Sequence, residues 1–180
     1  AGSSVFRRGA ASAIAAPAYA GIQVTHRDFT STVAFVTGHE KEDSPHPGPL
    51  LNKERVDAEG RRVRWDALAK IDTVVFLMGV GNSKQISERL IQAGRAPETP
   101  VAVIRWGTHL NQQVLTATSK TLSEEIQKAD LKPPSIIVVG DVVRLREQLR
   151  WFDNKPLFGK RILVTRSREQ ASELTHHLEE

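Results

Sequence analysis

Four consecutive residues, Thr25, His26, Arg27 and Asp28, place a hydroxyl, an imidazole, a guanidinium and a carboxylate side by side. Imidazole and carboxylate groups carry protons in catalysis and also bind metals, so the cluster suggests acid–base or metal chemistry. No second group of metal ligands stands at a suitable spacing, however, and a histidine beside an aspartate is more often a structural hydrogen-bonded pair. The sequence therefore predicts no metal site.

Glycine ends three of the apolar segments, at Gly79, Gly107 and Gly140. In open α/β sheets, ligands bind beyond the carboxyl ends of strands, where glycine allows a close approach of the backbone. A strand-to-helix turn explains each glycine equally well. The sequence contains no complete GxGxxG fingerprint, no GxxxxGK[ST] loop and no GxSxG elbow. These residues predict a candidate ligand edge, and no catalytic residue is assigned.

Five short apolar segments predict the strands of one sheet, because they are β-branched, apolar and bounded by turn residues. They are expected at residues 32–37, 73–78, 101–106, 114–118 and 135–140. The connection between the third and fourth strands is too short for a helical crossover, so this pair should be antiparallel and the sheet mixed. We predict an α/β fold, a three-layer domain with a mixed sheet of about five strands flanked by helices.

Segments with helical periodicity surround these strands. Helices are expected near the N-terminus, at residues 65–71, after Asn82, after Thr121 or Ser123, and at residues 142–149. Asn82 with Gln85 is the predicted capping pair of the third helix, and Gly94 is its predicted end. The polar segment 39–64 is much longer than an ordinary connection and is predicted to be mobile.

The composition is that of an ordinary globular protein, with 39% hydrophobic residues and a net charge of +4. The absence of cysteine excludes disulfides and thiolate metal sites and suits a cytoplasmic protein. No recognition motif accompanies the basic residues, so no nucleic-acid partner is predicted. No apolar run is long enough to predict a membrane span.

The N-terminal residues imitate a secretory signal, with two arginines, a small apolar stretch and the site Ala18-Tyr19-Ala20. The apolar part is mostly alanine, however, and Pro17 interrupts it. The following residues also continue directly into a foldable pattern. A short buried alanine-rich helix is therefore the preferred interpretation.

Four stretches together resemble uroporphyrinogen-III C-methyltransferases: SAIAAPAYAGIQVTHRDFTSTVAFVTGHE, TVVFLMGVGN, PVAVIRWGT and LKPPSIIVVGDVVRLREQLRWF. They occur in the order of that family and cover most of residues 11–152. The resemblance implies a dimeric enzyme that uses S-adenosylmethionine to methylate uroporphyrinogen III twice, giving precorrin-2 for sirohaem and cobalamin. It also implies two α/β domains with the cofactor between them, of which this chain matches the second, C-terminal one.

The resemblance further implies which residues touch the ligands. Ala11 and Ser12 occupy the positions of the cofactor-contacting pair that precedes the alanine-rich helix, although Arg8 replaces the proline of that motif. Met78 and Gly107 match two further cofactor positions without change. Arg27 is expected to pair with carboxylates of the acidic tetrapyrrole.

The last part of the chain resembles a different family. LFGKRILVTRSREQASELTHHLEE is similar to the beginning of uroporphyrinogen-III synthase, the enzyme that makes the methyltransferase's substrate. This implies a fused protein, divided here into a junction at residues 1–10, the methylase domain at 11–152, and a linker with the truncated start of the synthase at 153–180. Without the first methylase domain, the fragment alone is expected to be inactive. The alternative is a non-enzymatic basic α/β module that binds nucleic acid or a protein partner.

Overall fold

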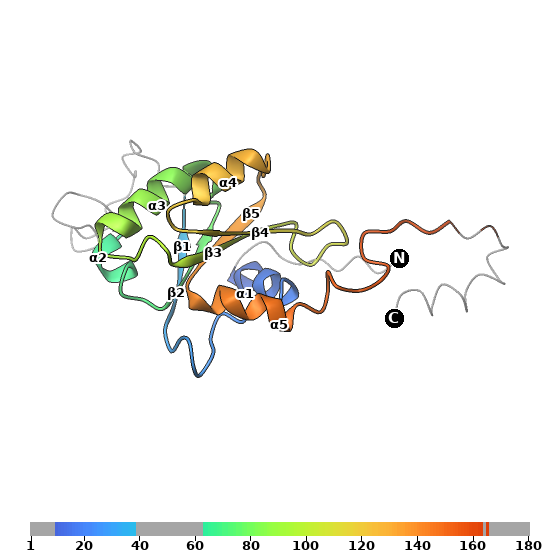
Figure 1. The fold of residues 1–180 in the computed structure, drawn as a ribbon, viewed down its shortest axis with the longest axis horizontal. Helices are drawn as coiled ribbons and strands as arrows, with labels where there is room; N and C mark the ends of the chain where they lie inside the picture. The colour runs from blue at the N-terminus through green and yellow to red at the C-terminus, as the bar shows by residue number, and fades with distance from the viewer. Residues whose placement is uncertain (1–9, 39–62, 164, 166–180) are drawn as a thin grey trace, which may run out of the picture.

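The computed structural model describes residues 10–38, 63–163 and 165, shown in colour in Figure 1. The predicted mobile loop falls almost wholly outside these residues, as does most of the synthase-like segment. The described elements, in chain order, are α1 (Ala10–Tyr19), β1 (Val33–Thr37), α2 (Trp65–Leu68), β2 (Thr73–Leu77), the 3₁₀ helix η2 (Val80–Asn82), α3 (Ser83–Gln92), β3 (Pro100–Arg105), β4 (Gln113–Thr118), α4 (Leu122–Lys128), β5 (Ser135–Val139), the 3₁₀ helix η3 (Asp141–Leu145) and α5 (Arg146–Leu149).

The five strands form one sheet in the order β1-β2-β5-β3-β4. β1 and β2 are parallel, whereas β5 is antiparallel to both β2 and β3, and β4 is antiparallel to β3. The predicted mixed sheet and the predicted antiparallel pair are therefore confirmed. Because β1, β2 and β3 run in the same direction, their last residues meet at one end of the sheet, called here the carboxyl end.

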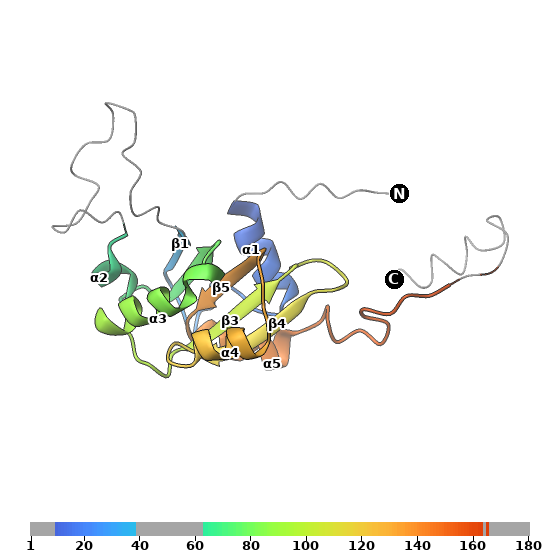
Figure 2. The same cartoon turned by 90° about the horizontal axis from the view of Figure 1, so that it is seen from above.

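Helices cover both faces of the sheet, which confirms the three-layer prediction (Figures 1 and 2). α2, α3 and α4 enclose one apolar core against one face, and α1 and η3 enclose a second core against the other. Successive residues of the central strands contribute side chains to opposite cores. Val74 and Phe76 belong to the first core and Val75 belongs to the second. Among the described residues, no helix is long and apolar enough to cross a membrane.

The N-terminal helix α1 is buried through its small residues, which confirms the preferred interpretation of the alanine-rich segment. Ala13 and Ala16 of α1, and Ala20 directly after it, are almost completely inaccessible to solvent and belong to the second core. Side chains of this size let the helix axis lie close to the sheet. α1 consequently packs directly on β2 and β5.

The start of α3 corrects one prediction. Asn82 occupies the N-cap position, but its side chain makes no capping hydrogen bond, and its amide nitrogen Nδ2 donates to the carbonyl of Gly38 at 2.9 Å. The predicted capping pair with Gln85 is wrong because η2 precedes the helix and turns Asn82 towards the end of β1. The predicted C-terminal glycine is confirmed, since Gly94 has a φ of +99° and Arg95 donates its N–H to the carbonyl of Leu90.

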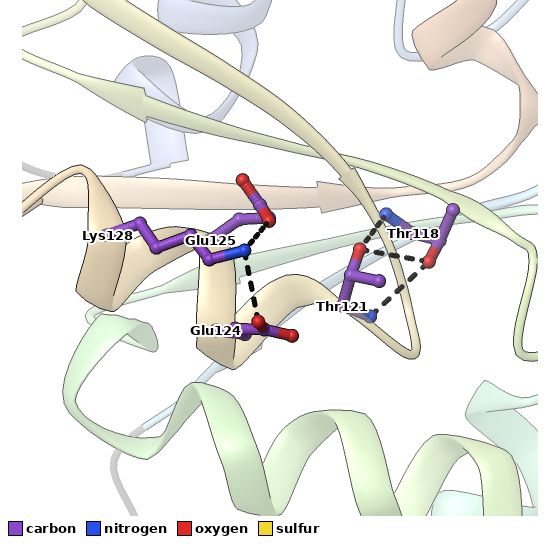
Figure 3. Close-up of polar contacts among 5 residues, drawn as sticks. All are labelled: Thr118, Thr121, Glu124, Glu125 and Lys128. Atoms are coloured by element: carbon purple, nitrogen blue, oxygen red, sulfur yellow. Dashed lines mark hydrogen bonds and ion pairs between the residues drawn. The ribbon is translucent and has the colours of Figure 1, made fainter.

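The start of α4 differs from expectation in the same way (Figure 3). Thr121 is the N-cap residue, yet its hydroxyl accepts the N–H of Thr118, and its own N–H is donated to the hydroxyl of Thr118. The side chain thus closes the turn from β4 and does not cap the helix. At the other end, Lys128 forms 3.0 Å ion pairs with Glu124 and Glu125. Its hydrogen bond to Glu125 is the main reason that the pKa of Lys128 is raised.

Asp72 joins the beginnings of the two parallel strands. Its Oδ2 accepts the backbone N–H and the hydroxyl of both Ser31 and Thr32, at 2.9 to 3.2 Å. These donors, with the N–H of Ser31 first, hold the pKa of Asp72 below its ordinary value of 3.8. The carboxylate therefore stabilises the fold in its ionised form.

We expect Asp72→Ala to lower the free energy of unfolding by about 1–2 kcal/mol at neutral pH, since the hydrogen bonds are charge-assisted but partly exposed to solvent. A lowered native pKa means that this stabilisation is present above about pH 4 and is lost as the pH falls through the native pKa. Urea unfolding at pH 7 and pH 3 measures the difference. Asp130→Asn is the control, because it neutralises an exposed ion pair with Lys132 and asparagine tolerates the φ of 47° at this residue. An equal loss of stability for Asp72→Ala at both pH values would contradict the assignment.

Candidate functional site

The structure brings Met78 and Gly107 to the same end of the sheet. Met78 directly follows β2, and Gly107 lies two residues after β3. The two strands run in the same direction on either side of β5. Two strand spacings amount to about 10 Å, so the two residues flank a narrow part of the carboxyl end.

The backbone at this end is strained in both connections. Met78, Trp106 and Thr108 have φ values of 57°, 49° and 75°, a left-handed region that non-glycine residues seldom adopt. Such conformations persist only where the surrounding structure holds them, and they cluster at functional sites. Met78 also leaves 66% of its surface exposed. Met78 therefore combines a strained backbone with an apolar side chain that the described residues leave mostly exposed.

Gly107 has a packing role that the sequence did not reveal. A Cβ atom built on Gly107 would lie 2.3 Å from the Cβ of Ala16 and 2.9 Å from its Cα. The absence of a side chain thus lets α1 lie directly on the end of β3. Any ligand contact at Gly107 would be made by its backbone, beside the helix.

The predicted cofactor pair Ala11 and Ser12 lies in the first turn of α1. The side chain of Ala11 is outside the described atoms, and Ser12 is partly buried. The same helix contacts β2 and β5 and, through Ala16, touches Gly107. All four predicted cofactor residues therefore belong either to α1 or to the sheet end on which it packs.

Gln112 is a buried residue that the sequence analysis missed. Its Oε1 accepts the N–H of Thr108 at 3.0 Å, and its Nε2 donates to the carbonyl of Tyr19 at 3.3 Å. It holds the loop after β3 to the C-terminal end of α1. A single glutamine in a polar turn carries no sequence signal for such a role.

The Arg105 guanidinium stacks on the ring of Trp106 in the same loop, 3.9 Å from the ring centroid. Cation–π contacts of this kind are favourable when the ring and the cation are shielded from water. The contact braces the residue that precedes Gly107. It therefore helps to keep Trp106 in its left-handed conformation.

Gly140 does not belong to this end, which corrects the grouping of the three glycines. It follows β5, and β5 runs opposite to β2 and β3. Gly140 has a φ of +146°, and a Cβ there would lie 2.5 Å from the carbonyl oxygen of Asp72. A glycine is needed here because the backbone of residue 140 lies close to the backbone of Asp72, at the amino end of β2. Strand direction, which the sequence left open for β5, decides this.

Arg27 also lies away from Met78 and Gly107. It is exposed in the loop between α1 and β1, near the beginnings of β1 and β2. Five strand residues, about 16 Å, separate that level from the carboxyl end. The structure therefore does not bring Arg27 into the cluster of cofactor residues.

His26 has the structural role that the sequence predicted. Its Nδ1 accepts the N–H of Asp28 at 3.2 Å, and its ring packs at 5.3 Å from Phe29. In the described part of the chain, no group of three His, Asp or Glu residues could hold a metal ion.

A small hollow lies beside this region without including it. It opens at the carboxyl end of β1 and is lined by Gly38, Trp65, Asn82 and Gln85 among others. Neither Met78 nor Gly107 borders it. The candidate site is therefore defined by the strained connections that follow β2 and β3, and not by this hollow.

We expect Gly107→Ala to destabilise the domain by about 1–3 kcal/mol, because the added methyl overpacks the contact with Ala16. Chemical denaturation measures the change. Gly81→Ala is the matched control, since nothing lies within 4 Å of a Cβ at that glycine. Adding Ala16→Gly to Gly107→Ala should restore part of the stability, and purely additive losses would show that the two residues do not interact.

Comparisons with known proteins agree with this arrangement. A family model for the Tetrapyrrole (Corrin/Porphyrin) Methylases matches residues 8–123. A uroporphyrinogen-III C-methyltransferase of Bacillus subtilis (strain 168) is 38% identical over 171 residues, covering 94% of this chain and 32% of that protein. A second B. subtilis protein of the same name is 44% identical over 148 residues, covering 82% of this chain and 52% of that one.

Solved structures give the same picture. Uroporphyrin-III C-methyl transferase from Thermus thermophilus, complexed with S-adenyl homocysteine, aligns with a TM-score of 0.53 and 25% identity. The alignment covers 72% of this chain and 50% of that chain. This chain thus spans about half, or less, of the length of the proteins it matches.

Proposed function

The chain belongs to the tetrapyrrole (corrin/porphyrin) methylases, and we propose from this that it is the C-terminal half of an S-adenosylmethionine-dependent uroporphyrinogen-III C-methyltransferase. The observation that carries the proposal is the family match over residues 8–123. This range includes Ala11, Ser12, Met78 and Gly107, the four positions expected to contact the cofactor. The two B. subtilis relatives named for this activity support the choice of substrate.

The residues at the carboxyl end suit the adenosyl part of S-adenosylmethionine. Methyl transfer needs a nucleophilic carbon to approach the sulfonium methyl group in line, so the protein mainly orients the reactants and excludes water. The exposed thioether of Met78 offers a soft, polarizable surface for an adenosyl group. The glycine backbone at residue 107 allows close approach beside α1. The S-adenyl homocysteine complex of the Thermus protein supports this cofactor.

An incompletely covered face supports the proposal that another domain completes the site. On the α1 side of the sheet, Phe35 of β1 remains 45% exposed, and Ile14 points outward from α1. With Met78, these side chains leave apolar surface that a second domain or a second copy of the chain would cover. We therefore propose that the intact enzyme is a two-domain homodimer. Arg27, on the other end of the sheet, is proposed to meet carboxylates of the bound tetrapyrrole.

The fusion to a uroporphyrinogen-III synthase is part of the same proposal. A match over 94% of this chain must extend well beyond residue 152, and the relative concerned is about three times as long as the matched part. The second relative matches 82% of the chain and is half covered. The longer match supports a protein in which another domain follows the methylase.

We expect the chain to bind S-adenosylhomocysteine, and Met78→Asn to weaken that binding about tenfold, since asparagine tolerates the left-handed conformation but removes the apolar contact. Calorimetric titration measures both affinities. Leu110→Asn is the matched control, because Leu110 has the same 66% exposure in the neighbouring loop. Equal losses in the two variants would contradict a specific role for Met78. No binding by the unmodified chain would place the affinity in the other half of the enzyme.

The chain alone is expected to show no methylation of uroporphyrinogen III, because it spans about half of the proteins it matches and the proposed cofactor cleft lies between two domains. The assay supplies reduced substrate and S-adenosylmethionine and follows the methylated product by chromatography. A full-length relative serves as the positive control. Product formation by the isolated chain would contradict the two-domain requirement.

A further inference from the structure

A buried ion pair fastens the residues that follow α5 to the domain. The guanidinium of Arg146 donates to a carboxylate oxygen of Asp153 and to the backbone carbonyl of Ala20. The two side chains are only 12% and 13% exposed. One arginine thus connects the end of α1, the start of α5 and the chain beyond it. Breaking a buried pair by removing one partner leaves a buried charge without compensation.

Aromatic rings reinforce this connection. The ring of Tyr19, at the end of α1, lies 4.8 Å from that of Phe152 and 5.1 Å from that of Trp151. Phe158 continues the cluster by an edge-to-face contact of 5.2 Å with Phe152. These distances and angles are the favourable ones for aromatic pairs. Residues 151–158 therefore pack against the C-terminal end of α1. Most of them belong to the segment that the sequence predicted to be a linker.

The C-terminal end of α1 is in turn hydrogen-bonded to the β3–β4 loop, which lies beside the candidate cofactor site. The carbonyl of Tyr19 accepts the side-chain amide of Gln112, and the same amide's oxygen accepts the N–H of Thr108. Thr108 is strained, with a φ of 75°, and directly follows Gly107. Figures 1 and 2 show the chain after α5 running beside the β3–β4 loop, and the carbonyl of Leu110 lies 3.5 Å from a Cβ built on Gly159.

We propose that Arg146 and Asp153 are positioning residues for the carboxyl end of the sheet. Their ion pair fixes residues 151–158 and the end of α1, and Gln112 passes this constraint to Thr108. The strained loop then keeps the conformation in which the backbone at Gly107 faces a ligand. Any domain that follows residue 158 is consequently joined to the candidate site through an anchored segment. The ligand part of this inference rests on the proposed function, whereas the constraint on the loop does not.

The test uses the full 180-residue chain and removes both charges together. Arg146→Met/Asp153→Leu replaces the pair by apolar side chains of similar size, which usually preserves stability, whereas Asp153→Asn alone is expected to destabilise the whole domain. Asp141→Asn is the control, because it removes an exposed ion pair with Arg144 at 3.2 Å. Three quantities are measured for each chain: urea stability, amide hydrogen exchange, and the affinity for S-adenosylhomocysteine.

In the double variant, we expect the amide of Thr108 to exchange about tenfold faster, while core amides such as that of Val138 keep their protection. Affinity for S-adenosylhomocysteine should fall by a similar factor, and the control should change neither quantity. Unchanged exchange at Thr108 in a folded double variant would overturn the inference. Faster exchange with unchanged affinity would overturn its ligand part. Faster exchange in a chain that binds no S-adenosylhomocysteine even when unmodified would support the loop constraint, overturn its ligand part for this chain, and place the affinity in the other half of the enzyme.

Discussion

The contact between Ala16 of α1 and Gly107 is the constraint on which the carboxyl end of this domain depends. It exists only because neither residue has bulk, since a single added carbon on Gly107 would lie 2.3 Å from the Cβ of Ala16. The contact fixes where α1 crosses the sheet, and so where its first turn stands relative to β2 and β3. The far end of the same helix receives Gln112 and Arg146. One small-residue helix thereby links the candidate cofactor site to the chain that leaves the domain.

The two ends of the sheet differ in their physical character. At the amino end, Asp72 collects four hydrogen bonds, and the guanidinium of Arg95 donates to the carbonyls of Ala69 and Asp72. Burial lowers the pKa of Arg95, although Asp141 and Asp72 oppose the shift. The carboxyl end instead has strained backbone at Met78 and Trp106. The polar groups of the amino end are therefore hydrogen-bonded within the domain, while the carboxyl end combines strained backbone with the exposed side chain of Met78.

Exposed apolar side chains are a further feature of the domain. Met78 and Phe35 remain 66% and 45% exposed, and both lie at or near the strands β1 and β2. The chain spans about half of the proteins it matches. The two apolar cores are each packed between the sheet and its helices, so the exposed apolar side chains lie outside them.

The sequence by itself determined the five strands, the mixed sheet, the buried alanine-rich helix and the membership in the methylase family. These features can be predicted because they depend on the residue types and spacing within short segments, including motifs such as Met78-Gly79. It could not place Gly140 or Arg27, because their positions depend on the direction of β5 and on which end of β1 a loop reaches. It also missed Gln112 and the Arg146–Asp153 pair, whose partners lie 93 and 7 residues away in sequence. Only the tertiary structure decides such contacts, because they arise when separate elements pack against α1.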